Sequence, residues 1–208
     1  MALYDQVQAA ADSIRKKSSV TPKVGVILGS GLGAFADSLA GATVIPYHEV
    51  PDFPTSSVPG HAGRLVLGTM QGAPIVAMQG RVHMYEGWAP WQVAFPARVM
   101  CALGIRSLVV TNAAGGIRAD LMPGDLMMIT DHLNLSGANP LTGPNDERLG
   151  PRFPDMSDAY NSSLRELLRR TADKLGLPSR RGSTCGWPAR PTRRPRKSAS
   201  CGRWGWTR

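Results

Sequence analysis

The stretch VGVILGSGLG at residues 24–33 decides the fold of this chain. Its first five residues form an unbroken apolar run, which is typical of a strand buried on both faces. The glycines that follow predict a tight turn, and residues 34–39 predict a helix directly after it. A buried strand, a glycine turn and a helix in succession indicate an α/β domain.

The same alternation continues along the chain. Four further strands are predicted at residues 64–67, 75–78, 107–111 and 125–130. Helices are predicted at residues 4–17 and 91–103, and from a cap at Ser157-Asp158 to about residue 175. Residues 136–156 are rich in Gly, Pro, Asn and Asp and are expected to form a long loop.

The charge is concentrated at one end. Residues 181–208 hold 8 of the 24 Lys and Arg and none of the 15 acidic residues, so residues 1–180 are nearly neutral. We therefore expect one domain in residues 1–180 and a basic, disordered tail in residues 181–208.

No apolar run approaches the ~20 residues that cross a bilayer, and the N-terminus lacks a signal-peptide layout. We expect a cytoplasmic protein without a membrane partner.

The glycine turn at residues 29–33 favours an anion. Glycines let backbone N–H groups approach a phosphate closely, and Ser30 adds a hydroxyl donor. The pattern also fits a dinucleotide fingerprint through Gly29, Gly31 and Ala34, with Glu49 twenty residues after the first glycine. A nicotinamide-dependent dehydrogenase therefore remains open at this point.

Three more segments contain residues suited to an anion. GHAGR at residues 60–64 places a histidine between glycines, and TNAAGG at residues 111–116 follows a buried strand with small residues. QGRVHMYEG at residues 79–87 offers the guanidinium fork of Arg81, and His83 lies three residues before Glu86. No Cys/His spacing indicates a metal. Together the segments predict a site that binds phosphate, either as the free anion or as part of a nucleotide.

The chain resembles the purine nucleoside phosphorylase family over about residues 1–180. The segments that carry the resemblance are GVILGSGLG (25–33), VPGHAGRLVLG (58–68), MQGRVHMYEGW (78–88), TNAAGGI (111–117), GDLMMITDHLNLSGANPLTGPN (124–145) and RFPDMSDAY (152–160). GRVHMYEG and NPLTGPN favour the trimeric inosine/guanosine type over a methylthioadenosine phosphorylase-like enzyme. The resemblance implies a mixed, twisted central sheet flanked by helices, with the C-terminal third of the family's domain missing.

The resemblance also implies residue roles. Phosphate would be held by Ser30, His61, Arg81, His83 and the backbone of Ala113. Catalysis would involve His83 and Glu86, with the carboxylate orienting the imidazole. Tyr85 would contact the ribose, and Phe153 would reach a neighbouring subunit's ribose pocket in a homotrimer. No purine-binding residue is assigned within this chain.

The implied reaction is phosphorolysis of a purine nucleoside to the free base and ribose 1-phosphate. Phosphate is then a co-substrate, and neither a metal nor an organic cofactor is required. A non-enzymatic alternative is nucleic-acid binding through the tail, because its interleaved Arg and Trp suit phosphate contact and base stacking.

The tail has a second interpretation that explains its composition. Residues 181–208 contain no Leu, Ile, Val, Met or Phe but 3 of the 5 Trp. When the third base of each tail codon is read with the first two of the next, a consistent choice gives VYVRLAGPTYETPAEIRILRALGVDA. This string contains the GPxYETPAEIR pattern of the resembled family.

We therefore predict a one-base slip of the reading frame between about Leu175 and Gly182. Sequencing the gene across codons 170–210 and beyond tests this hypothesis. A read with no extra or missing base in that interval contradicts it.

Overall fold

The computed structural model describes residues 1–55 and 62–186, and the chain forms two compact units. The first unit comprises residues 1–113 and 138–152. The second comprises residues 114–137 and the chain from residue 153 onward. Each unit is described by itself.

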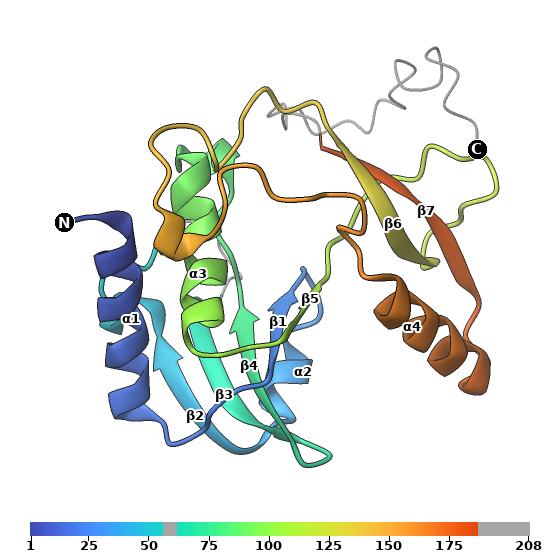
Figure 1. Ribbon diagram of the computed structural model, residues 1–208. Coiled ribbons are helices and arrows are strands. Elements are labelled where there is room, and N and C mark those ends of the chain that lie inside the picture. The colour runs from blue at the N-terminus through green and yellow to red at the C-terminus, as the bar shows by residue number, and fades with distance from the viewer. Residues whose placement is uncertain (56–61, 187–208) are drawn as a thin grey trace. The chain divides into compact units, whose positions relative to one another are not determined.

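The first unit is built on a five-stranded sheet in the order β2-β3-β4-β1-β5 (Figure 1). Its strands are β1 (Val24–Leu28), β2 (Ala40–Pro46), β3 (Arg64–Met70), β4 (Ala73–Gln79) and β5 (Ser107–Val110). β1 runs parallel to both β4 and β5, whereas β2, β3 and β4 pair antiparallel. The sheet is therefore mixed, as the resemblance implied.

Helices cover both faces of this sheet. α1 (Leu3–Lys17) and α3 (Pro90–Ala102) pack on one face, where Leu65 and Leu67 of β3 join a core with Phe95. The short helix α2 (Ala34–Asp37) lies on the other face, where Val66 joins a second cluster. Successive side chains of a strand point to opposite faces, so the apolar run of β3 serves both cores.

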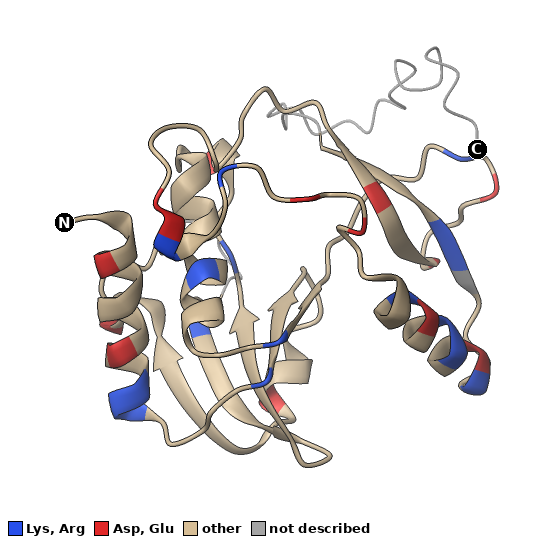
Figure 2. Cartoon of the chain, viewed as in Figure 1, with Lys and Arg blue, Asp and Glu red and all other residues tan. Residues whose placement is uncertain are grey.

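The charges of the first unit lie outside the sheet. Among the five strands only Arg64, the first residue of β3, is charged. Figure 2 shows the other charges on the helices and loops, with an acidic and basic row along α1. An unpaired buried charge is costly, so this distribution is expected for β1, β3 and β4, whose residues are mostly buried.

The second unit contains a parallel pair of strands and one helix. β6 (Leu126–Asn134) pairs with β7 (Ser179–Gly186), and α4 (Ser162–Lys174) begins where the side chain of Asn161 accepts a hydrogen bond from the amide of Leu164. Asn is a favoured N-cap because its oxygen satisfies one orphan N–H of the first turn.

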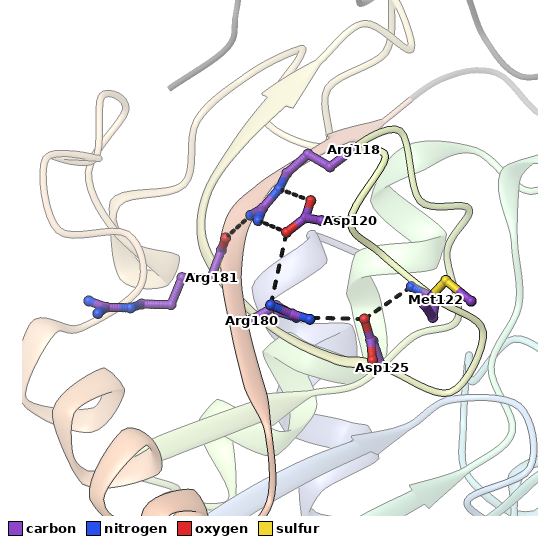
Figure 3. Close-up of polar contacts among 6 residues, drawn as sticks. All are labelled: Arg118, Asp120, Met122, Asp125, Arg180 and Arg181. Atoms are coloured by element: carbon purple, nitrogen blue, oxygen red, sulfur yellow. Dashed lines mark hydrogen bonds and ion pairs between the residues drawn. The ribbon is translucent and has the colours of Figure 1, made fainter.

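A surface network of polar contacts fixes the start of β7 (Figure 3). The guanidinium of Arg118 forms two hydrogen bonds with the Asp120 carboxylate and donates a third to the carbonyl of Arg181, at 2.8 Å. Arg180 lies 3.7 Å from the Asp125 carboxylate, which accepts the amide N–H of Met122. The hydrogen bond from Arg118 lowers the pKa of Asp120. These contacts are exposed and hence sensitive to salt.

Most predicted elements are present, with some differences. β2 and β7 were not predicted, and β6 continues to Asn134 rather than ending at Thr130. α4 begins at Ser162, not at the predicted Ser157-Asp158 cap. Residues 181–186, which were predicted to be part of a disordered tail, instead belong to β7 and pair with β6. The rest of the predicted tail, after Gly186, lies outside the described residues. Within the described residues, no helix has the length and apolarity needed to cross a membrane.

We predict that Leu67→Ala lowers the free energy of unfolding by about 2–5 kcal/mol, because it leaves a cavity in the core. Leu67 is 1% exposed. Leu108→Ala in β5 is the matched control, since this leucine belongs to the same sheet but is 38% exposed. Chemical denaturation measures both variants, and equal losses would contradict this assignment of the core.

Candidate functional site

The glycine turn lies where β1 ends. The chain leaves Leu28, turns through residues 29–33 and enters α2 at Ala34. The amide of Leu32 donates to the carbonyl of Gly29 at 3.2 Å, and Gly31 has a φ of 84°, a conformation that favours glycine. A cavity of about 90 Å³ adjoins this turn and is lined by Leu28, Gly29, Ser30, Gly31, Gly33, Ala62, Gln79 and Gly80.

Arg81 ties two strand ends together. It follows β4, and its Nη1 donates to the carbonyl of Leu28 at 3.1 Å and to that of Thr111 at 3.3 Å. Leu28 is the last residue of β1, and Thr111 directly follows β5. One guanidinium group therefore joins the carboxyl ends of two parallel strands.

A histidine–carboxylate pair follows Arg81. The Oε1 atom of Glu86 lies 2.9 Å from Nδ1 of His83 and also accepts the backbone N–H of His83 at 2.8 Å. The Glu86 side chain is 3% exposed, whereas that of His83 is 24% exposed. The carboxylate occupies one ring nitrogen, so the other, Nε2, is the nitrogen suited to meet a ligand.

The tyrosine of this segment stacks on the imidazole. Residues Met84–Glu86 form a short 3-10 helix, η2, rather than an extended strand. The rings of His83 and Tyr85 are 4.7 Å apart and inclined by 18°. Tyr85 is 59% exposed, so one face of its ring is open to a ligand.

The predicted residues fall into three groups. Ser30, Arg81, His83, Tyr85, Glu86 and Ala113 all belong to the first unit, at the carboxyl ends of β1, β4 and β5 or just beyond them. Phe153 belongs to the second unit and is 87% exposed. His61 lies outside the described residues.

Two polar side chains beside the glycine turn received no role from the sequence. Gln79, at the end of β4, is 9% exposed and donates from Nε2 to the carbonyl of Gly33 at 3.0 Å. Thr111 accepts the amide N–H of Gly29 on its hydroxyl at 2.7 Å. The signal that could have indicated them is a polar residue directly ending an apolar strand, where its partner is expected to be backbone.

Neither a metal centre nor the dinucleotide pattern finds support here. Within residues 1–55 and 62–186, no three His, Cys, Asp or Glu residues lie together as a metal site would require. Glu49, the acidic residue of the dinucleotide pattern, pairs with Lys17 of α1, and this hydrogen bond lowers the pKa of Glu49.

These features define an α/β protein with a candidate anion site at the carboxyl edge of its parallel strands, the position where open α/β sheets bind ligands. The sequence pattern of the Phosphorylase superfamily matches residues 23–205, and the chain belongs to this superfamily. Purine nucleoside phosphorylases are among the members of the superfamily that it matches, which confirms the resemblance.

Purine nucleoside phosphorylase 1 of Geobacillus stearothermophilus is 53% identical over 176 residues, covering 85% of this chain and 64% of the relative. The enzyme of Bos taurus is 50% identical, over 83% of this chain and 61% of the relative. This chain therefore spans less than two thirds of the length of these relatives.

Solved structures of purine nucleoside phosphorylases share the fold of this chain. The isoform 2 enzyme of Schistosoma mansoni, in complex with cytosine and ribose-1-phosphate, superposes with a TM-score of 0.90 at 42% identity. The match covers 97% of this chain and 73% of that one. A second Schistosoma mansoni structure, in complex with inosine, has a TM-score of 0.85 at 41% identity and covers 90% of this chain and 68% of that one.

We predict that Glu86→Ala lowers the free energy of unfolding by about 1–3 kcal/mol, because it leaves the partly buried N–H of His83 without its acceptor. Glu166→Ala is the control, since Glu166 pairs with Arg169 on the exposed side of α4. Thermal or chemical denaturation should show a clearly smaller loss for the control. If the Glu86→Ala variant is as stable as the Glu166→Ala control, the carboxylate of Glu86 has no structural role.

Proposed function

We propose that this chain carries the phosphate half of a purine nucleoside phosphorylase site. The observation that carries the proposal is the convergence of the segments around residues 29–33, 80–86 and 111–113 at one edge of the sheet. Backbone N–H groups and a guanidinium suit a phosphate dianion there. The similarity to purine nucleoside phosphorylases favours free phosphate over a nucleotide.

In this proposal the phosphate contacts come from Ser30, His61, Arg81, His83 and the backbone of Ala113. Glu86 orients the imidazole through the 2.9 Å contact to Nδ1, so that Nε2 faces the anion. Tyr85 and Phe153 contact the ribose, the latter in a neighbouring subunit of a homotrimer.

The reaction that these groups support is displacement at C1′ of the ribose. A phosphate oxygen forms the new C1′–O bond as the C1′–N bond breaks, and the purine leaves with the bonding electrons and takes up a proton. A fixed phosphate supplies both proximity and negative charge beside a cation-like transition state. This chemistry needs no metal and no organic cofactor. The substrates are a purine nucleoside and inorganic phosphate, and a cytoplasmic location suits them.

The organisation of the whole protein is also part of the proposal. Residues 1–180 are the N-terminal two thirds of one phosphorylase domain, and residues 181–208 are read out of frame. The GPxYETPAEIR pattern of the family is then present only in the shifted frame of residues 181–208. We expect the 208-residue protein to bind phosphate but to turn over little or no nucleoside, because it lacks that pattern.

Isothermal titration of the 208-residue protein with inorganic phosphate tests the phosphate half. We expect binding that Arg81→Met weakens at least tenfold, because the planar donor fork is lost. Arg15→Met is the matched control, since Arg15 is an exposed arginine of α1 whose partners are Asp12 and the carbonyl of Ala102.

The catalytic half is tested with inosine and phosphate, by following hypoxanthine and ribose 1-phosphate. The protein as written and the product of a gene corrected by one base are assayed side by side, and only the second should turn over readily. Absence of phosphate binding by the first protein overturns the proposed site, whereas ready turnover by it overturns the proposed loss of the base half.

A further inference from the structure

The glycine turn is anchored at its first residue by a hydroxyl from the next strand. The amide of Gly29 donates to Oγ1 of Thr111 at 2.7 Å, and the same hydroxyl donates to the carbonyl of Ile27 at 3.0 Å. The amide of Thr111 also donates to Ile27, at 3.0 Å. Thr111 therefore bridges the carbonyl of Ile27 in β1 and the amide of Gly29, the first residue of the turn.

The two backbones approach each other unusually closely at this point. A Cβ atom on Gly29 would lie 2.9 Å from the carbonyl oxygen of Thr111 and 3.1 Å from Cα of Asn112. Backbone atoms cannot move aside as the end of a flexible side chain can. The Thr111 hydroxyl thus holds the turn where only glycine fits.

The last residue of the turn is anchored from the opposite neighbour of β1. Nε2 of Gln79 donates to the carbonyl of Gly33 at 3.0 Å, and Oε1 of Gln79 accepts from Nε of Arg64. Arg64 in turn donates from Nη2 to Asp37 at 2.8 Å. Because the guanidinium occupies Oε1, the amide of Gln79 is oriented with its NH₂ group toward Gly33.

Between these anchors lie the groups that would meet the anion. Ser30 is exposed, and the amides of Ser30 and Gly31 donate to no group among the described residues. The orientation of these amides depends on the flanking peptide groups, which Thr111 and Gln79 hold in place by hydrogen bonds. Donors held in place before the ligand arrives lose less conformational entropy on binding.

We propose that Thr111 and Gln79 are positioning residues that hold the two ends of the glycine turn, so that its amides and the Ser30 hydroxyl are aligned for phosphate. This inference rests on the proposed function, since it names the groups that preorganise the same site. Neither side chain need touch the phosphate itself.

The test compares Thr111→Val, which keeps the β-branched shape and removes the hydroxyl, with Thr111→Ser, which restores the hydroxyl. Thr69→Val is the matched control, because the Thr69 hydroxyl on β3 also donates to a backbone carbonyl, that of Ala40. Amide hydrogen exchange of residues 29–33 is followed by NMR without phosphate, and inorganic phosphate is titrated by calorimetry.

In Thr111→Val we expect exchange of the Gly29 amide to be at least tenfold faster and the phosphate dissociation constant to rise about tenfold, consistent with the loss of one hydrogen bond. Thr111→Ser and Thr69→Val should match the wild type in both measurements. The amide of Val76, which lies in the core strand β4, reports in the same spectra on loosening of the whole fold.

Gln79→Met probes the other end of the turn independently of Thr111. It should speed exchange in residues 29–33 and weaken phosphate binding without changing exchange at Val76. If Thr111→Val and Gln79→Met both bind phosphate as the wild type does, the inference fails while the proposed function stands. If the wild-type chain itself binds no phosphate, the proposed function fails and this inference fails with it.

Discussion

The parallel pairing of β1 with β4 and with β5 is the constraint on which the rest of the first unit depends. Its register sets Leu28 beside Gln79 and Ile27 beside Val110, so the three strands end nearly level. The segments that follow must therefore leave the sheet side by side. Antiparallel strands would send alternate loops to opposite edges, and Arg81 could not then reach the carbonyls of both Leu28 and Thr111.

The electrostatics of this edge rely on dipoles more than on net charge. Among the described residues, Arg81 and Arg64 supply fixed positive charge there. Two contacts of Arg81 are to strand-end carbonyls, and Arg64 is paired with Asp37. The Glu86 carboxylate would oppose an anion, but it is 3% exposed and held by the amide and Nδ1 of His83. The imidazole thus lies between that carboxylate and any ligand at Nε2. Oriented backbone amides complete the site without the cost of burying further charges.

The sequence predicted the strands that are continuous apolar runs, but it did not always predict their burial: residues 107–110 were expected to form a buried strand, yet Val110 of β5 is 54% exposed. The run 24–28 and the apolar core of β4 can be recognised because strands covered on both faces need continuous apolar residues. β2 was missed because its sequence AGATVIP is rich in small residues and leaves only Ile45 buried. α4 was predicted from its leucine spacing, but this spacing says nothing about burial, and Leu167 is 60% exposed.

The site was predictable to the same degree for the same reason. Glycines and charged groups after a strand indicate a loop that meets a ligand, and this signal is the reason why Ser30, Arg81 and His83 were predicted to bind phosphate. Gln79 and Thr111 gave no such signal, because their partners are backbone groups brought near only by the pairing of the strands. A single sequence shows which residue types are present, but it does not show the register in which the strands pair.

β7 gives an independent reason to favour the shifted reading frame. The strand runs through Gly182, a residue type that is depleted in strands, and none of its described side chains is buried. It nevertheless pairs with β6 along its length, with a shift in register between Ile129 and Asp131. The shifted frame begins with Val-Tyr-Val at these same codons, and β-branched and aromatic residues are the types that strands prefer. Residues 182–184 thus lie in a strand, and the residues of the shifted frame have a higher strand preference than those of the frame as written.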